Sequence, residues 1–267
     1  MRYEVIIPSA QVVPGELQKI GKLPAVIYLI NQKIMFDYLY EQYKDRCKYI
    51  RVICHDKAEK VRQCLAKYAS EKLIIENLPV LSDLGYTIYF ALRNTDTPVI
   101  INFADTIVMD GLTQIVEDIC FFSWDYLSDK WTFFDEEDGT IVSVQNKVPL
   151  TSVEKKKLFV GVFAIANTRY FRECLEEAFN TRERSESTFY YALMQYSRRF
   201  PVNMVEAKEW FDIGHADTYY NSNLEVRARE FNHIFIDKNR GILKKTSENK
   251  EKFIGEIRWY LKLPFGY

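Results

Sequence analysis

An aspartate at the end of an apolar run is the residue best placed to do chemistry. Residues 99–105 are mostly apolar and β-branched up to Asp105, and Pro98 precedes them, where a strand tolerates proline. Such a continuous run predicts a strand buried on both faces of a parallel sheet. Open α/β sheets bind ligands beyond the carboxyl ends of their strands, so Asp105 is a candidate ligand-binding residue. The alternative is that Asp105 caps the next helix.

The histidines and cysteines offer weaker candidates. The three histidines are His55, His215 and His233, and no two of them have the spacing of metal ligands. His215 could touch a substrate, although a structural turn residue is the commoner role. The five cysteines are scattered and form no C-x-x-C pair, which argues against a zinc site and for reduced thiols. The lysine run 155–157 predicts a solvated face or, alternatively, a contact with an anionic acceptor.

The composition is typical of a folded protein with a large apolar core. The chain has 267 residues, enough for one large or two modest domains, and 48% of them are hydrophobic. The 36 basic and 37 acidic residues are well mixed, so the charge pattern predicts no nucleic-acid partner. No apolar run approaches the roughly 20 residues of a membrane span, and the chain opens directly with a strand-like segment. We therefore expect a cytoplasmic protein without membrane insertion, and both the monomer and the homo-oligomer stay open.

Strands and helices must alternate around Asp105 for such a site to form, and the pattern predicts that they do. Strands are expected at 3–8, 49–54, 73–77 and 99–105, and helices at 35–43, 58–68 and 83–94. An extended segment is expected at 23–33, with a turn at Asn31 and Gln32. This alternation predicts an α/β fold of three layers, Rossmann-like, with a mixed, mainly parallel sheet flanked by helices.

The second half carries hairpin signals among further strands and helices. Segments 131–134 and 140–144 flank a turn that ends at Gly139, which predicts a hairpin. A C-terminal extension is expected to contain a second hairpin, of 234–236 with 242–244, and a last helix. We place a domain boundary between residues 230 and 231. Further strands are expected at 159–165, 202–205 and 209–214, and helices at 170–179, 187–196, 217–230 and 249–261.

Six short motifs follow one another over roughly residues 1–225. They are Ile6-Ile7-Pro8-Ser9-Ala10, Leu23-Pro24-Ala25, Phe103-Ala104-Asp105, Gln145-Asn146-Lys147-Val148-Pro149, Val160-Gly161-Val162-Phe163 and Trp210-Phe211-Asp212-Ile213-Gly214. In this order and spacing they resemble the motifs of the sugar-phosphate and choline-phosphate nucleotidyltransferases. The resemblance implies a nucleotide-binding, GT-A-like α/β fold. It also implies transfer of a nucleoside monophosphate from an NTP to a phosphorylated acceptor, with release of pyrophosphate.

The resemblance implies roles for individual residues. Asp105 and Asp212 would hold Mg²⁺, because nucleotidyl transfer builds negative charge that cations neutralise, and Mg²⁺ takes carboxylate and phosphate oxygens. The alternative for Asp212 is a turn residue. Lys147 matches a lysine that binds the acceptor's phosphate, or else is a solvated residue beside the hairpin, and Gly161 and His215 would also contact the acceptor. The residues implied for the nucleotide are Pro8, Ser9, Ala10, Gly85, Thr87 and Asp105.

The loop after the first strand departs from the family pattern. Residues 11–17 contain one glycine and no arginine, whereas the family's loop has several glycines and an arginine that grips the triphosphate. Ala25 stands where the family has a catalytic lysine. A lysine is a point charge on a flexible stem, so its position can be relocated. We assign the catalytic role to Lys22, with Lys19 as the second choice.

Residues 231–267 have a resemblance of their own. Segments 231–237, 241–245 and 256–260 resemble the opening of a choline-kinase or aminoglycoside-kinase lobe, in which a strand lysine pairs with a helix glutamate. Lys244 or Lys245 would pair with Glu256. The segment is too short for kinase activity, so we expect it to pack on the main domain. Such paired modules occur in bacterial capsule and surface-polysaccharide proteins, which favours that setting.

Three functions are open from the sequence. The first is a Mg²⁺-dependent nucleotidyltransferase for surface-polysaccharide synthesis, with an NTP (CMP favoured as the transferred group) and a sugar phosphate, polyol phosphate or phosphocholine-like acceptor as partners. The second is a nucleotide-sugar glycosyltransferase, which would need a second acid such as Asp110. The third is a catalytically impaired nucleotide-binding module, because the loop arginine and lysine are missing.

Overall fold

The computed structural model describes residues 3–109, 117–147, 155–180 and 188–238. The chain divides into two compact units, residues 1–222 and 223–267, and each is considered by itself. The described part of the second unit is the continuation of helix α6 (Ala216–Lys238). No helix in the described ranges combines the length and apolar character needed to cross a bilayer.

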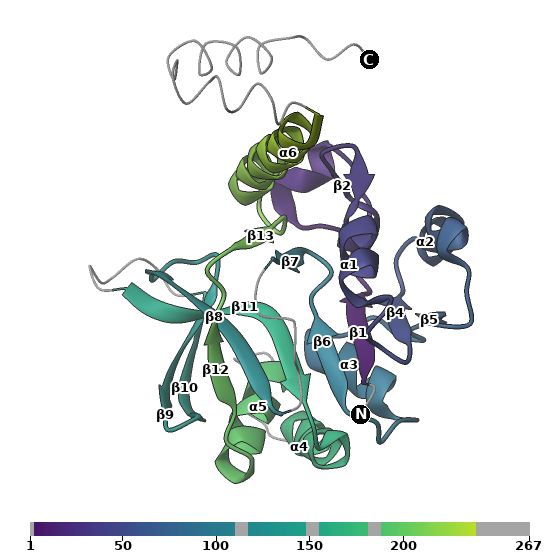
Figure 1. The fold of residues 1–267 in the computed structure, drawn as a ribbon. Coiled ribbons are helices and arrows are strands. Elements are labelled where there is room, and N and C mark those ends of the chain that lie inside the picture. Colours follow the sequence, from purple (N-terminus) through teal and green to yellow (C-terminus); the bar gives the residue numbers. More distant parts are fainter. Residues whose placement is uncertain (1–2, 110–116, 148–154, 181–187, 239–267) are drawn as a thin grey trace. The chain divides into compact units, whose positions relative to one another are not determined.

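One mixed sheet, with nine strands among the described residues, organises the first unit (Figure 1). Its strands follow the order β10-β9-β11-β6-β1-β4-β5, with β8 beside β11 and β12 beside β8. Their bounds are β1 (Glu4–Ser9), β4 (Ile50–Cys54), β5 (Leu73–Asn77), β6 (Val99–Asn102), β8 (Ile119–Tyr126), β9 (Thr132–Glu137), β10 (Thr140–Asn146), β11 (Lys155–Ile165) and β12 (Asn203–Glu206).

The two halves of this sheet pair differently. β1 pairs in parallel with β4 and β6, and β4 pairs in parallel with β5. Beyond β6, the long strand β11 pairs antiparallel with β6, β8 and β9. Every residue of β4 and β6 is buried, as apolar strands covered on both faces require.

Helices cover both faces of the sheet and enclose two apolar cores. One core joins the sheet to α3 (Leu84–Leu92), α4 (Thr168–Asn180) and α5 (Thr188–Arg199). The other joins it to α1 (Met35–Tyr43) and α2 (Ala58–Leu65). Ile6 of β1 belongs to the first core, and its neighbours Val5 and Ile7 belong to the second. Successive strand residues point to opposite faces, so this split confirms the predicted three-layer α/β fold.

Short elements complete the first unit. β7 (Thr106–Val108) pairs with β13 (Trp210–Asp212), and β2 (Leu29–Ile30) pairs with β3 (Lys33–Ile34). Asn31 and Gln32 have φ values of 45° and 69°, typical of a type I′ hairpin, which confirms the predicted turn. The segment predicted as extended at 23–33 instead contains a 3₁₀ turn. The 3₁₀ turns are η1 (Gly15–Lys19), η2 (Ala25–Ile27) and η3 (Ala66–Tyr68).

Three further sequence predictions were wrong in detail. β6 ends at Asn102, so Asp105 lies in the turn before β7 and not at the strand's last residue. The first hairpin turns at Asp138 and Gly139, because β9 and β10 continue into the acidic segment predicted as a loop.

The third difference concerns the tail. Residues 234–236, predicted as a strand, belong to α6, because residues 216–238 contain no glycine or proline to end the helix. The partner segment 242–244 and the last predicted helix lie outside the described residues. The boundary at 230/231 and the kinase-like character of 231–267 stay predictions.

Candidate active site

The turn that carries Asp105 is held by a buried asparagine at the end of β6. The Asn102 amide donates to the carbonyl oxygens of Phe103 (2.8 Å) and Thr106 (3.0 Å). Tyr43 of α1 donates its hydroxyl to Asn102 Oδ1 at 2.7 Å. Because these bonds satisfy the buried amide and join both ends of the turn, they fix the backbone around Asp105.

Gly161 of β11 supports the same turn. Its φ is 96°, and a Cβ there would lie 2.8 Å from the Phe103 ring and 3.2 Å from the Thr106 hydroxyl. The Gly161 carbonyl accepts the Phe103 N–H at 2.9 Å. Gly161 therefore leaves room for the turn that holds Asp105, and its predicted contact with the acceptor stays a prediction.

Asp212 reaches this turn through the short β7–β13 sheet. Ile213 donates its N–H to the Asp105 carbonyl at 2.9 Å, which places the two acids on adjacent segments. The Asp212 carboxylate accepts hydrogen bonds from the Gly214 N–H (3.0 Å) and from the Thr218 hydroxyl (2.6 Å). The start of α6 therefore orients the second acid.

The two carboxylates converge beside Gly214. A Cβ at this glycine would lie 3.0 Å from Asp105 Oδ2 and 3.2 Å from Asp212 Oδ1, so a side chain there would occupy the space between the acids. Burial and, after it, the nearby Asp212 carboxylate raise the pKa of Asp105 to about 6, although hydrogen bonds from the backbone and Thr106 act in the opposite direction. Within the described ranges, no lysine or arginine forms an ion pair with either acid.

His215 lies next to the acid pair. Its Nδ1 is 3.6 Å from Asp212 Oδ2, and its ring packs edge-on against Trp131, with the ring centroids 5.2 Å apart. Nδ1 is buried and has no hydrogen-bond partner among the described residues. A partly buried imidazole in this position can contact a ligand held by the acids.

The chemistry of this acid pair fits Mg²⁺. Mg²⁺ is commonly held by one or two carboxylates together with phosphates and water. Across the described segments, no group of three or more His, Cys, Asp or Glu side chains is arranged to hold a metal ion. Asp105 and Asp212, with the space that Gly214 leaves between them, therefore offer two acidic ligands and leave the other positions to a substrate.

A cavity of about 230 Å³ contains the predicted nucleotide-binding residues. It lies where β1 ends and α3 begins, and it also includes Gln11, Asp83 and part of the loop after β1. None of the described residues that line it is basic. The predicted residues in its wall are Pro8, Ser9, Ala10, Thr87 and Asp105.

Gly85, the sixth predicted nucleotide-binding residue, faces another helix. A Cβ at Gly85 would lie 2.0 Å from Thr188 Oγ1 and 2.8 Å from the Phe189 nitrogen. Asp83 caps α3 by accepting the Tyr86 N–H at 2.9 Å. The close packing of α3 on α5 is therefore the steric reason for glycine at this position.

A second cavity, of about 240 Å³, shares Asp105 and Pro14 with the first. It also contains Asp212 and two of the three predicted acceptor-binding residues, Lys147 and His215. The cavities thus meet at one of the two acids. The second cavity also has an aromatic wall of Phe103, Trp131, Phe159 and Tyr190.

Two lysines line this second cavity. Lys147 has a φ of 50°, unusual for a residue with a side chain, and its N–H donates to the Trp131 carbonyl at 3.1 Å. Lys130 forms an ion pair with Asp217. Because no acid among the described residues pairs with the Lys147 ammonium, this lysine is the more available of the two for an anion.

The remaining predicted residues lie away from the acids or outside the description. Lys22 and Lys19 are exposed, neither lines these two cavities, and Lys19 pairs with Glu16 at 3.3 Å. The catalytic role of Lys22 stays a prediction. Asp110, the acid that a glycosyltransferase would need, lies outside the described residues.

The lysine run 155–157 belongs to β11 rather than to a free surface segment. Lys156 pairs with Asp135 at 3.3 Å, and Lys157 pairs with Glu136 at 2.6 Å. These ion pairs join β11 to the β9–β10 hairpin.

Sequence reasoning missed several supporting residues. Asn102 and Tyr43 fix the Asp105 turn, and Thr218 orients Asp212. Asn102 carried one signal, since a polar residue in a buried apolar run needs hydrogen-bond partners. Tyr43 carried no signal, because its partner Asn102 is distant in sequence. Thr218 carried none either, because its contact with Asp212 depends on where α6 begins.

Neither a protein-family model nor a curated protein sequence matches this chain. Solved structures do match its fold. The chain is similar to the CTP:phosphocholine cytidylyltransferase LicC from Streptococcus pneumoniae, with a TM-score of 0.66 and 14% identity over 85% of this chain and 100% of that one. It is also similar to a UDP-glucose pyrophosphorylase complexed with UDP-glucose, with a TM-score of 0.69 and 16% identity over 86% and 100% of the two chains.

A third similar structure is the inositol-1-phosphate CTP transferase from T. maritima. Its TM-score is 0.56 and its identity 12%, over 83% of this chain and 95% of that one. At identities this low, the TM-scores show a shared fold and nothing beyond it. The fold predicted from the motif order is therefore confirmed by comparison as well as by the sheet itself.

Proposed function

We propose that this chain is a Mg²⁺-dependent nucleotidyltransferase that joins a nucleoside monophosphate from an NTP to a small phosphorylated acceptor. One observation carries the proposal: Asp105, which lines both cavities, meets Asp212 beside Gly214. The proteins with a similar fold support it, because their names describe transfer or pyrophosphorolysis of nucleotide conjugates of phosphocholine, glucose and inositol phosphate.

The two cavities divide the substrates between them. Residues 8–10 and Thr87 would surround the nucleotide, and Lys147 would bind the acceptor's phosphate in the second cavity. An acceptor phosphate oxygen forms the new bond to the α-phosphorus, and the bond from that phosphorus to pyrophosphate breaks. Mg²⁺, held by Asp105 and Asp212, would neutralise the negative charge that accumulates on the phosphates. Because Asp105 lines both cavities, this neutralisation would take place where the cavities meet.

Within this proposal, CTP is our first choice of nucleotide and a compact polyol phosphate, sugar phosphate or phosphocholine our choice of acceptor. Two of the similar structures are named as CTP-using enzymes. A second cavity of about 240 Å³ suits a small acceptor. Synthesis of precursors for a surface polysaccharide, in the cytoplasm, is the setting that the sequence favours.

Pyrophosphate release tests the proposal. The purified chain is incubated with CTP, UTP, GTP, ATP or dTTP and a panel of phosphorylated acceptors, with and without Mg²⁺. We expect release with at least one pair, and only with Mg²⁺. Asp105→Asn and Asp212→Asn should each lower the rate at least roughly a thousandfold, because a carboxylate–metal contact supplies several kcal/mol of transition-state stabilisation.

Asp45→Asn is the matched control, since Asp45 is an exposed aspartate distant in sequence from both acids. It should react at the wild-type rate. The proposal is wrong if no NTP and acceptor pair releases pyrophosphate, or if Asp105→Asn is as active as Asp45→Asn.

A nucleotide-binding module without transfer activity is the second candidate function. The observation that favours it is the cavity of Pro8–Ala10 and Thr87, whose described wall has no basic side chain to bind a triphosphate. This module would bind CTP in calorimetry with little dependence on Mg²⁺ and would release no pyrophosphate. Mg²⁺-dependent binding together with release would rule it out.

A further inference from the structure

The cavity at the end of β1 has one part that faces the reaction and one part that does not. Asp105 and Pro14 also line the second cavity, so they mark the part where the phosphates would react. Gln11, Ser82 and Asp83 line only the first cavity. A nucleotide whose phosphates lie beside Asp105 therefore has its nucleoside along this unshared wall.

A glutamine joins the two loops that form the unshared wall. Gln11 follows β1, and Ser82 lies between β5 and α3. The Gln11 amide nitrogen donates to the Ser82 carbonyl oxygen at 3.3 Å. Because a carbonyl oxygen only accepts hydrogen bonds, this contact fixes which end of the amide faces Ser82 and leaves Oε1 for another partner. No described residue donates to Oε1, and the side chain is exposed at the cavity, so a ligand can reach it.

The other polar groups of this wall also favour a ligand that donates hydrogen bonds. The Ser82 carbonyl has two lone pairs, and Gln11 uses one of them. Asp83 adds a negative charge, and no described lysine or arginine pairs with it. The Thr87 hydroxyl donates to the Asp83 carbonyl at 3.1 Å and is thereby occupied. The hydroxyls of Ser9 and Ser82 accept as readily as they donate, so they do not discriminate.

We infer that Gln11 selects a nucleotide whose base carries an exocyclic amino group, and cytosine over uracil in particular. Cytosine has the N4 amino donor where uracil has the O4 carbonyl acceptor. The amino group has one N–H for Gln11 Oε1 and one for the Ser82 carbonyl. Uracil would instead place a carbonyl oxygen against these acceptors. Gln11 could turn its amide nitrogen toward that oxygen only by giving up its bond to Ser82.

This inference rests on the proposed function, which places a nucleotide in the first cavity, and it names the residue that reads the base. Calorimetric titration tests it without any need for catalysis. The dissociation constants of CTP and UTP are measured with Mg²⁺ for the wild type, Gln11→Leu and Gln11→Glu. We expect the wild type to bind CTP at least about fivefold more tightly than UTP, which corresponds to roughly one net hydrogen bond.

The two variants separate the acceptor from the size of the side chain. Gln11→Leu has no acceptor, so its CTP and UTP dissociation constants should agree within about twofold, mainly because CTP binding weakens. Gln11→Glu keeps acceptor oxygens and should keep a preference for CTP. Gln63→Leu, at an exposed glutamine of α2, is the matched control and should show the wild-type ratio.

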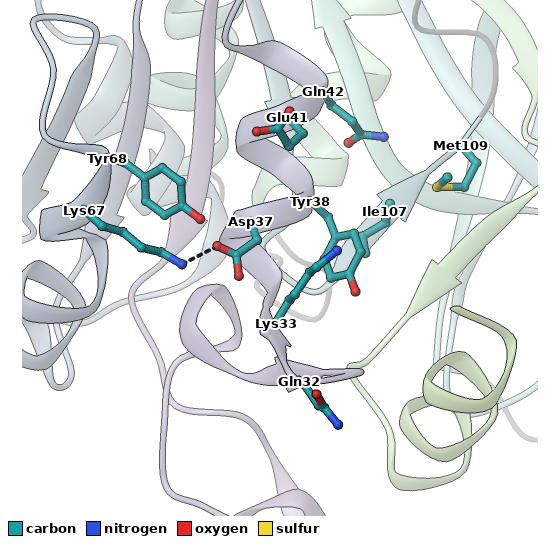
Figure 2. Close-up of a pocket in the computed structure, with 10 residues that line it drawn as sticks. All are labelled: Gln32, Lys33, Asp37, Tyr38, Glu41, Gln42, Lys67, Tyr68, Ile107 and Met109. Carbon is teal, nitrogen blue, oxygen red and sulfur yellow. Dashed lines mark ion pairs between the residues drawn. The ribbon is translucent and has the colours of Figure 1, made fainter. Parts of the chain in front are cut away.

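A larger cavity is the competing place for a nucleotide, and a further control addresses it. This cavity measures about 720 Å³ and lies beside Gln42 of α1 (Figure 2). Figure 2 shows Lys67 in its wall, paired with Asp37 at 2.8 Å. A nucleotide bound there would lose a cation in Lys67→Ala. We expect this variant to leave both dissociation constants unchanged.

Four results would overturn the inference. They are equal binding of CTP and UTP by the wild type, a wild-type ratio in Gln11→Leu, weaker binding in Lys67→Ala but not in Gln11→Leu, and no binding of either nucleotide. Pyrophosphate release keeps this inference apart from the proposed function. A preference for CTP that depends on Gln11, without release, would support the base contact and contradict transfer. Release by a Gln11→Leu variant that still prefers CTP would support transfer and overturn the role of Gln11.

Discussion

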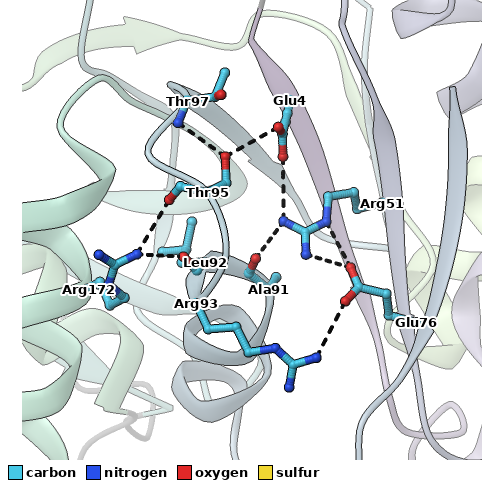
Figure 3. A network of polar contacts seen from close by, with 9 residues as sticks. All are labelled: Glu4, Arg51, Glu76, Ala91, Leu92, Arg93, Thr95, Thr97 and Arg172. Carbon is cyan, nitrogen blue, oxygen red and sulfur yellow. Dashed lines mark hydrogen bonds and ion pairs between the residues drawn. The ribbon is translucent and has the colours of Figure 1, made fainter.

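Two buried clusters of charged side chains in the first unit are built on opposite principles. One lies between β1, β4, β5 and the end of α3 and is shown in Figure 3. Its centre is Arg51, which donates to Glu76 Oε1 from Nε (2.8 Å) and Nη2 (2.5 Å) and to the Ala91 carbonyl (2.5 Å). Glu4 accepts from Arg51 at 3.5 Å and from the Thr95 hydroxyl at 3.2 Å.

The other cluster is the acid pair. Asp105 and Asp212 approach the same point, and their described partners are backbone N–H groups, two hydroxyls and an imidazole. In the Arg51 cluster each carboxylate meets a guanidinium, whereas here like charges stand together. The first cluster is complete within the protein, whereas the proposed function requires a cation from solution at the second. The first two expectations below therefore change the free energy of unfolding in opposite directions at the two clusters. The third depends on added metal.

The largest expected effect is at the complete cluster. Arg51→Met should lower the free energy of unfolding by about 3–5 kcal/mol, because it leaves Glu4 buried without its cation. Urea unfolding measures the change. Arg169→Met, which removes an exposed arginine paired with Glu173, is the control and should cost no more than about 1 kcal/mol. Equal losses in the two variants would show that the buried cluster adds little.

The second expectation has the opposite sign. Asp105→Asn should raise the free energy of unfolding of the metal-free protein by about 3 kcal/mol at pH 7.5, because it removes a charge whose pKa is raised to about 6. The effect should depend on pH. The folded protein holds the Asp105 proton more tightly than the unfolded chain, so wild-type stability falls relative to the variant as the pH rises from about 4 to about 6.

Urea unfolding of both proteins at a series of pH values follows this difference. It should be small below pH 4 and constant above about pH 7. If Asp105→Asn is less stable than the wild type at every pH, the charge on Asp105 does not destabilise the metal-free protein.

The third expectation is that Mg²⁺ stabilises the protein through the acid pair. At ten times its dissociation constant, Mg²⁺ should raise the free energy of unfolding by about 1.4 kcal/mol, and in Asp212→Asn this gain should disappear. Thermal unfolding with and without Mg²⁺, in the presence of CTP, measures it. Arg51→Met should keep the gain, since its cluster holds no metal. The same gain in Asp212→Asn would place the metal elsewhere.

The smallest expected effect concerns the support of Asp212. Thr218→Val removes the 2.6 Å hydrogen bond to the Asp212 carboxylate and should cost about 1 kcal/mol of stability and roughly tenfold in pyrophosphate release. Ser222→Ala is the comparison, because the Ser222 hydroxyl donates to the Asp212 backbone carbonyl at 2.8 Å and not to the carboxylate. If both variants lose activity equally, Thr218 has no specific role in orienting the acid.

Local patterns predicted much of the fold because they reflect local physics. The apolar runs of β1, β4 and β6 became buried strands, since only a sheet covered on both faces accommodates them. The tail was predicted less well. The short apolar run 234–236 is compatible with a strand or a helix, and its position within an uninterrupted helix decided between them.

The candidate site was only partly predictable. Most of the residues predicted for the nucleotide line one cavity, because they are consecutive in the chain or begin the following helix. The ligand contacts predicted for Gly85 and Gly161 stay predictions, while the atoms nearest to a Cβ at these positions belong to Thr188 and Phe103, which are distant in sequence. A glycine in a motif shows that space is needed, and only its neighbours show what occupies that space.

Residue types and short-range order were enough to predict the alternation of strands and helices, the balance of charge and the two aspartates. The meeting of the aspartates beside Gly214, the full pairing of Arg51 and the cavity beside Gln42 became visible only in the folded chain. These features depend on contacts between segments far apart in the chain, and short-range patterns carry no information about which distant side chain will be present.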